Sequence, residues 1–152
     1  QTAYDAPTTP PPAHPAPPGF DFAALLAALT RPQVALPNGG RLIIEPTAAL
    51  TAVDVDGGAG DALSVNLAAA DELARQLRLR NLGGVVMADF IRLKARGDQE
   101  KLLARLRAAV ADDPMQTDVY GLTRLGLAEM TRARRGRSLA ETLADFEGWE
   151  AA

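Results

Sequence analysis

Two aspartates, each close to the end of a short hydrophobic run, are the residues of this chain best placed to do chemistry. Asp54 lies in the run Ala-Val-Asp-Val-Asp, and Asp89 closes the run Val-Val-Met-Ala-Asp. Both runs have the pattern of buried β-strands, and the residues between them predict an amphipathic helix. Strand, helix and strand form a βαβ unit with two parallel and usually adjacent strands. We therefore expect the two carboxylates to lie side by side at one edge of a sheet.

Two neighbouring carboxylates repel each other, and a divalent cation relieves that repulsion. Mg²⁺ prefers oxygen ligands and is often held by one or two carboxylates, with water and phosphate completing its coordination. Asp54 and Asp89 therefore predict a Mg²⁺ site for metal-assisted phosphodiester hydrolysis. The simpler interpretation is that each aspartate starts a turn or caps the following helix. The pattern by itself leaves both interpretations open.

The surrounding residues predict an α/β fold, with an antiparallel meander followed by βαβ units in one mixed sheet and with helices packed on the sheet. The small residues 57–60 predict a flexible loop that lets a phosphate approach the carboxylates, and a plain loop is the alternative. Residues 81–84 are expected to end the long helix with glycine. The expected helices are 22–29, 62–79, 99–111 and 125–135, the last opened by Thr123, and the expected strands are 34–36, 42–45, 50–55, 85–89 and 116–120.

The chain divides by composition into three parts. Residues 1–19 form a proline-rich tail that we expect to be extended or disordered, and 20–139 form the folded part. Residues 140–152 form an acidic segment in which Leu143, Phe146 and Trp149 are expected to pack. The chain has no cysteine, which excludes disulfides and thiolate chemistry. No apolar run reaches the roughly 18 residues of a membrane span and no signal-peptide pattern is present, so we expect a cytoplasmic protein without a membrane partner.

Basic residues are concentrated in two regions, although the net charge is −3. Residues 122–137 contain five arginines and one glutamate, and residues 75–96 contain a second cluster. Such clusters contact phosphates, and Arg80, Arg124 and Arg132 are candidates for that contact. The alternative is that these arginines belong to a solvated helix face.

Several stretches of the chain resemble the RNase E/G endoribonucleases, in the DNase I-like subdomain of their catalytic half. The most specific stretch is Arg-Gln-Leu-Arg-Leu-Arg-Asn-Leu-Gly-Gly, residues 75–84, which runs directly into the strand before Asp89. The similarity covers roughly residues 20–139. The other matching stretches are 39–56, 66–70, 85–91 and 121–132.

The resemblance implies a specific activity and site. Asp54 and Asp89 fall on the positions of the two aspartates that bind the catalytic Mg²⁺ of the family. Asp56 stands where the family has an asparagine that orients the site, so its extra charge is expected to tighten or distort metal binding. The family cuts single-stranded RNA, often AU-rich, and leaves 5′-phosphate and 3′-hydroxyl ends. The resemblance therefore implies that Arg80, Arg124 and Arg132 bind the RNA backbone.

The chain also departs from the family pattern. The family's OB-type and RNase H-like domains are not visible in this sequence, and without cysteine it lacks the family's zinc link. The expected partners are therefore single-stranded RNA and either the missing domains of a longer chain or a second copy in a homodimer. The main hypothesis is a Mg²⁺-dependent endoribonuclease or its catalytic subdomain. The alternatives are a non-catalytic RNA-binding or scaffold module and a structural assembly domain.

Overall fold

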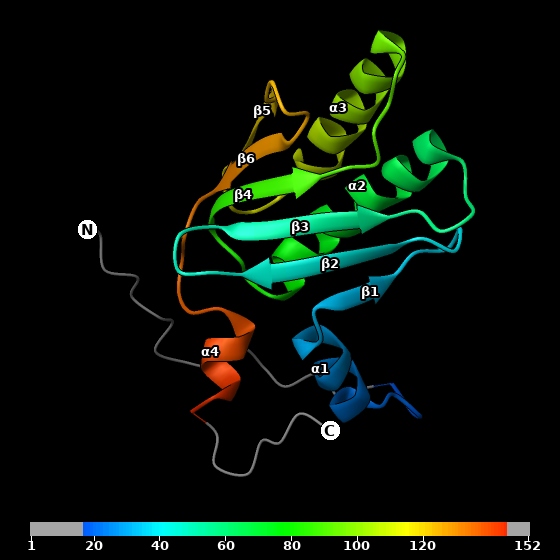
Figure 1. Cartoon of the computed structure of the whole chain (residues 1–152). Coiled ribbons are helices and arrows are strands. Elements are labelled where there is room, and N and C mark those ends of the chain that lie inside the picture. The colour runs from blue at the N-terminus through cyan, green and yellow to red at the C-terminus, as the bar shows by residue number, and fades with distance from the viewer. Residues whose placement is uncertain (1–16, 146–152) are drawn as a thin grey trace.

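The computed structural model describes residues 17–145 of the 152-residue chain. Most of the predicted proline-rich tail, together with Phe146 and Trp149, lies outside the described residues. The described part contains four helices and six strands (Figure 1). In chain order they are α1 Phe22–Thr30, β1 Gln33–Ala35, β2 Arg41–Pro46, β3 Thr51–Asp56, α2 Ala62–Leu79, β4 Gly84–Asp89, α3 Arg96–Val110, β5 Thr117–Leu122, β6 Ala128–Arg132 and α4 Leu139–Leu143.

The six strands form one mixed sheet in the order β1-β2-β3-β4-β6-β5. Neighbouring strands are antiparallel except β3 and β4, which are parallel and are joined by the helix α2. A second connection, through α3, leads from β4 to β5, and β6 lies between these two strands. The predicted α/β fold, with its antiparallel meander and its βαβ connection, is therefore confirmed.

The helices α2 and α3 lie together on one face of the sheet and cover the core (Figure 1). Strand residues alternate in burial because successive side chains point to opposite faces. On the helix-covered face, burying each large aliphatic side chain contributes about 1.5–3 kcal/mol. On the opposite face, Val85 is 43% exposed and Tyr120 is 63% exposed. The strand residues buried under the helices include Leu42, Ile44, Val53, Val55, Val86, Ala88, Ala128 and Met130.

The predicted helix over 125–135 is wrong, because this segment is the second strand of a hairpin, β6. The hydroxyl of Thr123 accepts hydrogen bonds from the backbone N–H groups of Leu125 and Leu127, at 3.2 and 3.1 Å. Thr123 thus stabilises a tight loop instead of capping a helix, and Gly126 takes a positive φ of 92° in it. The alternating burial of Ala128–Arg132 fits a strand covered on one face.

The helix α2 ends where the sequence predicts, but with asparagine in the position expected for glycine. Asn81 has a φ of 48°, in the left-handed region that asparagine tolerates better than most residues. The N–H of Leu82 donates to the carbonyl of Leu77 and that of Asn81 to the carbonyl of Arg78. This is the Schellman arrangement, which satisfies the last helical carbonyls.

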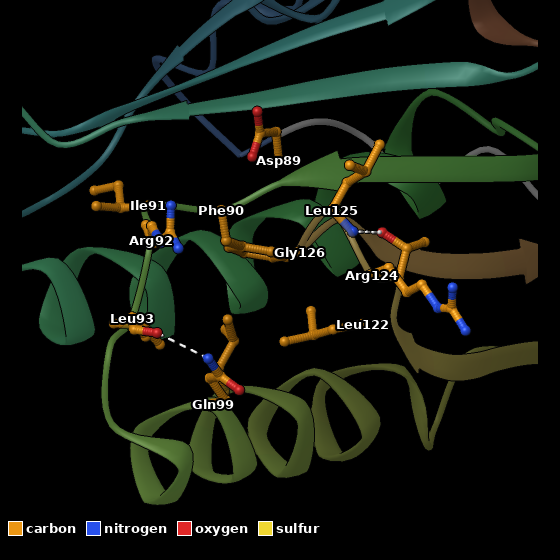
Figure 2. A pocket seen from close by; sticks show the side chains of 12 residues that line it. Asp89, Phe90, Ile91, Arg92, Leu93, Gln99, Leu122, Arg124, Leu125 and Gly126 are labelled. Atoms are coloured by element: carbon orange, nitrogen blue, oxygen red, sulfur yellow. Dashed lines mark hydrogen bonds between the residues drawn. The ribbon is translucent and has the colours of Figure 1, made fainter.

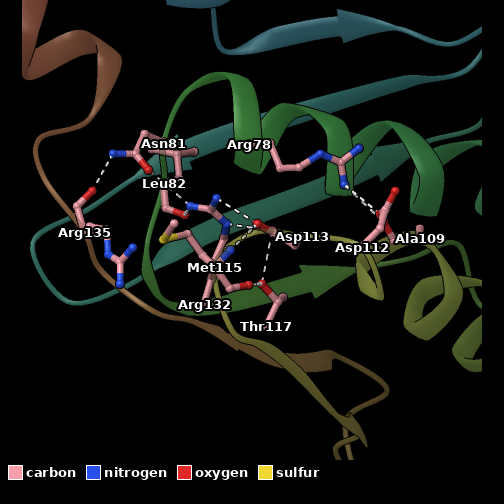
Figure 3. Close-up of polar contacts among 10 residues, drawn as sticks. All are labelled: Arg78, Asn81, Leu82, Ala109, Asp112, Asp113, Met115, Thr117, Arg132 and Arg135. Carbon is pink, nitrogen blue, oxygen red and sulfur yellow. Dashed lines mark hydrogen bonds and ion pairs between the residues drawn. The ribbon is translucent and has the colours of Figure 1, made fainter. Parts of the chain in front are cut away.

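A buried ion pair joins β6 to the segment between α3 and β5 (Figure 3). The guanidinium of Arg132 donates to both carboxylate oxygens of Asp113, at 2.8 and 3.1 Å. It also donates to the side-chain oxygen of Asn81 and to the carbonyl of Leu82, at 3.3 and 3.1 Å. Because these donors and acceptors are matched, the buried charges are compensated and the end of β6 is attached to the end of α2.

The segment after β6 ends in the short helix α4, which the sequence analysis did not predict. Ser138 and Glu141 form a reciprocal capping box at its start, and Leu143 is buried as expected. The N–H of Leu139 donates to the carbonyl of Arg80, which places α4 beside the end of α2. Across residues 17–145, no helix combines the length and the apolar composition that crossing a membrane requires.

Acidification is expected to remove the stability that Asp113 contributes. Burial raises the pKa of this carboxyl, but hydrogen bonds from Arg132, Met115 and Thr117 and the charge of Arg132 together hold its pKa below the ordinary 3.8. Because the folded-state pKa is the lower one, the contribution is complete above 3.8 and is lost as the pH falls toward the folded-state value. Urea denaturation from about pH 6 to about pH 3 measures this loss.

The matched control is Asp113→Asn, which removes the titrating group. This variant should be less stable at neutral pH by about 3 kcal/mol, because it leaves Arg132 buried without its counter-charge. Its stability should depend less steeply on pH in the acidic range. An equally steep dependence in both proteins would contradict the assignment.

Candidate functional site

Asp54 and Asp89 lie directly opposite each other on the parallel strands β3 and β4. Neighbouring strands are about 4.8 Å apart, so the two side chains leave the sheet side by side. Both are exposed, and both point to the face that α2 and α3 do not cover. Figure 2 shows Asp89 and the next residue, Phe90, on opposite sides of β4. The sequence prediction that these two carboxylates lie next to each other agrees with this register.

The two carboxylates are unusual among the acidic residues of the molecule because they lack partners. Within residues 17–145, neither Asp54 nor Asp89 forms a hydrogen bond or an ion pair, whereas most other carboxylates there do. Two adjacent negative charges repel each other. The fold maintains this arrangement, which is typical of a functional site and has no evident structural benefit.

Asn66 of α2 holds the chain immediately after Asp89. Its side-chain amide donates to the carbonyl of Ile91 at 2.7 Å, and its oxygen accepts the N–H of Ile91 at 3.0 Å. The side chain is fully buried. Both backbone hydrogen-bonding groups of Ile91 are thus bound by one side-chain amide, which fixes the chain where it leaves β4, two residues after Asp89.

The loop after β3 packs closely because it is rich in glycine. A Cβ atom at Gly57 would lie 2.4 Å from the Cδ1 atom of Ile91, and a Cβ at Gly60 would lie 2.7 Å from Val65. The loop then passes into α2, where Asp61 caps the helix by accepting the N–H of Ser64 at 2.9 Å. The loops after the two parallel strands therefore approach each other closely, as the glycines at 57 and 60 allow.

These loops and strand ends enclose an open cleft of about 370 Å³. Its polar lining comes from the three aspartates of the predicted site, Asp54, Asp56 and Asp89. Gly57, Gly58 and Gly60 form one wall. A cleft of this size admits a hydrated cation together with a phosphate group.

Asp56 is paired with a cation on the neighbouring strand, unlike Asp54 and Asp89. Its carboxylate accepts a hydrogen bond from Arg41 at 2.7 Å and another from the N–H of Gly58 at 3.1 Å. The Gly58 N–H, followed by the bond and the charge of Arg41, lowers the pKa of Asp56. Arg41 therefore offsets the extra negative charge that Asp56 adds to the site.

The donor set of the site fits Mg²⁺ bound through two carboxylates. Across the described residues 17–145, no group of three or more histidine, cysteine, aspartate or glutamate side chains is arranged to hold a metal. Mg²⁺ keeps several waters and commonly takes one or two protein carboxylates with substrate phosphate, so Asp54 and Asp89 are a sufficient set for it. The same pair is too few ligands for a closed structural zinc site.

The structure separates the three arginines predicted to bind RNA. Arg124 is exposed on the β5–β6 loop. Arg132 is 4% exposed and paired with Asp113, and Arg80 is 6% exposed with its Nε donating to Gln76 at 2.7 Å. A guanidinium buried in this way does not face an RNA phosphate. The interpretation of Arg80 and Arg132 is therefore corrected: both are structural residues, and only Arg124 stays available.

Sequence reasoning missed two residues that shape the site, Asn66 and Arg41. The sequence predicts Asn66 only as a residue of the helix 62–79. An amide on the apolar face of an amphipathic helix nevertheless needs a buried partner, and that is the signal that could have found it. Arg41 stands alone before a hydrophobic strand, and only the antiparallel register of β2 and β3 pairs it with Asp56.

Comparison with known proteins points to one family. The profile of the Ribonuclease E/G family matches residues 15–135. The chain is 44% identical over 134 residues to ribonuclease E of Nostoc sp.. It is 43% identical over 118 residues to ribonuclease E of Escherichia coli, and 37% identical over 132 residues to ribonuclease G of the same organism.

The shares of each chain covered by these matches are unequal. The matches to the Nostoc ribonuclease E, the E. coli ribonuclease E and the E. coli ribonuclease G cover 83%, 72% and 82% of this chain. The same matches cover only 20%, 11% and 27% of those three relatives. The chain thus spans about a fifth of the length of the Nostoc relative.

Replacing Asn66 is expected to loosen the site as well as the fold. Asn66→Ala leaves both the N–H and the carbonyl of Ile91 unpaired, which should lower the free energy of unfolding by about 2–3 kcal/mol. Backbone hydrogen exchange at residues 90–92 should accelerate more than exchange in β2. Unchanged exchange at Ile91 would show that the amide does not hold this segment.

Releasing Asp56 is expected to strengthen binding of a divalent cation. In Arg41→Gln, the carboxylate of Asp56 loses its ion pair and its pKa moves up toward the ordinary value, yet it stays ionised at neutral pH. The cleft then carries more uncompensated negative charge, so the affinity for Mg²⁺ should rise by about two- to tenfold. Calorimetric titration measures this change, and the double variant Arg41→Gln/Asp56→Asn should lose the gain.

Proposed function

Because the chain belongs to the Ribonuclease E/G family, we propose that it is a Mg²⁺-dependent endoribonuclease, or the catalytic subdomain of one. Its substrate is single-stranded RNA, and its products carry 5′-phosphate and 3′-hydroxyl ends. The observation that carries this proposal is the unpartnered pair Asp54 and Asp89, held opposite each other across two parallel strands. The names of the relatives support ribonuclease activity, and the donor set supports Mg²⁺.

In the proposed reaction, the residues of the chain position the phosphodiester and the cation. Asp54 and Asp89 would hold Mg²⁺ at the edge of the sheet, and Asn66 maintains the position of Asp89 through Ile91. Such an ion would supply positive charge to the transition state and lower the pKa of water. A water oxygen forms the new bond to phosphorus and loses a proton to solvent, the bond from phosphorus to the 3′-oxygen breaks, and the 3′-oxygen takes a proton from solvent.

Arg124 is proposed to bind the RNA backbone beside the reacting phosphate. It is exposed on the β5–β6 loop, and within the described residues it has no ion-pair partner. A free guanidinium binds phosphate through two parallel N–H groups, which fixes orientation as well as position. The glycine-rich loop after β3 leaves room for the backbone on the other side of the carboxylates.

A non-catalytic RNA-binding module is the second candidate. One observation favours it: the chain spans a small part of the length of its relatives. Positioning of substrate is a large part of catalysis, and the remaining length of those proteins is available to supply it.

A cleavage assay separates the two candidates. A 5′-labelled, AU-rich single-stranded RNA should be cut by the wild type in Mg²⁺ and not in EDTA. Asp54→Asn and Asp89→Asn should each lower the rate by more than about a hundredfold, because each removes one of the two metal ligands. Asp118→Asn, an exposed carboxylate of β5, is the matched control and should cut at the wild-type rate.

The same samples decide the alternative. Circular dichroism establishes that each variant is folded, and binding of the RNA is measured in EDTA. RNA binding without cleavage by a folded wild type would replace the enzyme with the binding module. Cleavage that persists in both carboxylate variants would show that the active site lies elsewhere.

A further inference from the structure

A second hollow adjoins the carboxylate cleft and shares its wall. It has a volume of about 600 Å³ and lies between the end of β4, the start of α3 and the β5–β6 loop. The two hollows share three lining residues, Asp89, Phe90 and Ile91. A polynucleotide with one phosphate at the carboxylates can therefore place its neighbouring nucleotide in the second hollow. Neither the proposed metal site nor the packing of the core accounts for the presence of this hollow.

The walls of this hollow carry both polar and apolar surface, and one apolar side chain on them is freely exposed. Phe90, Leu102 and Leu122 supply buried or half-buried surface. Leu125 at the tip of the β5–β6 loop is 89% exposed, the most exposed of the large hydrophobic side chains described. Thr123 and Gly126 hold the loop in one conformation, so the exposure of Leu125 is built into the hairpin. A flat apolar ligand gains by covering this side chain.

The hollow also contains one amide that is only partly used. Gln99 in the first turns of α3 donates one N–H to the carbonyl of Leu93 at 2.8 Å. Within residues 17–145, its side-chain oxygen has no partner, and its second N–H is also free. Figure 2 shows this side chain reaching from α3 into the space near Leu93 and Leu122. A free acceptor beside a free donor matches the hydrogen-bonding edge of a nucleobase.

The rim of this hollow is positively charged, and the end that it shares with the first cleft carries the carboxylate of Asp89. Arg92 and Arg124 line the hollow, both are exposed, and neither has an ion-pair partner among the described residues. Figure 2 shows the Arg124 guanidinium directed away from Asp89, toward the outer side of the β5–β6 loop. One exposed apolar side chain, one amide and a basic rim beside a candidate metal site match a base and its phosphates. An acidic peptide would be repelled at the carboxylate end.

We propose that this hollow is the subsite for the nucleobase next to the scissile phosphate of single-stranded RNA. Leu125 is the surface on which the base packs, and Gln99 is the residue that reads its edge. Arg124 holds the phosphate beyond that base. The proposal deepens the proposed function and rests on it, because the scissile phosphate is placed by Asp54 and Asp89.

Substitutions at Leu125 and at Gln99 should affect RNA binding in different ways. Leu125→Ala removes the packing surface, so it should weaken binding of every RNA by about fivefold, whatever the base. Leu125→Phe enlarges the surface and should restore or improve binding. Gln99→Met keeps the volume and removes the amide, so discrimination among the four bases at one position should fall to within about twofold. Leu79→Ala is the matched control, since Leu79 is 39% exposed at the far end of α2.

The measurement uses short RNAs that differ at one position at a time. Affinity is measured by fluorescence anisotropy with Asp54→Asn as the uncleaving background, and cleavage sites are mapped with the wild-type aspartate. Thermal denaturation of every variant controls for the hydrogen bond that Gln99 gives to Leu93. A base preference at one position next to the cut, lost in Gln99→Met and kept in Leu79→Ala, is the expected result.

The outcomes separate this proposal from the proposed function. If the wild type cuts RNA and neither Leu125→Ala nor Gln99→Met differs from Leu79→Ala, the subsite proposal is wrong and the endoribonuclease stands. If no RNA is cut but Gln99→Met abolishes a base preference in binding, the hollow is a base site in a non-catalytic module. If no RNA binds, both proposals are wrong.

Discussion

The parallel pairing of β3 with β4 is the constraint on which the candidate site depends. Parallel neighbours require a crossover, and α2 supplies it along a face of the sheet that buries Leu73 and Leu77 completely. The crossover brings residues 54 and 89 into register, and an antiparallel pairing would place their carboxylates at opposite ends of the sheet. The apolar face of one helix therefore brings together two charges that repel each other.

Other contacts refine this placement. The amide of Asn66 fixes the exit from β4, and the glycines at 57 and 60 let the two exit loops approach each other. Arg41 reduces the charge beside the pair by binding Asp56. The stability of the fold and the geometry of the site thus share residues, and α2 contributes to both through opposite ends of its length.

The strands and helices up to residue 110 follow closely from hydrophobic periodicity, because each has one clearly apolar face. The βαβ register was also predictable, since short strands separated by one helix leave few arrangements. The prediction of a helix over 125–135 is wrong because Leu127 and Met130 have a spacing that a helix also allows, whereas the strand buries Ala128 and Met130 in alternation. The decisive contacts, Thr123 to two backbone N–H groups and Arg132 to Asp113, join residues whose proximity no local pattern reveals. For the same reason, Arg80 and Arg132 could not be distinguished from surface arginines by composition.

The position of β6 between β4 and β5 has a consequence for how the chain acquires its structure. Residues 51–89 contain both aspartates and the helix that joins their strands, so this unit can form from nearby contacts. One edge of β4 nevertheless stays without a partner until residues 128–132 join the sheet. An unpaired edge on a hydrophobic strand is a template for strands of other chains. Pairing with β6, which is anchored by its terminal arginine, therefore protects the strand that carries Asp89 from association with other chains.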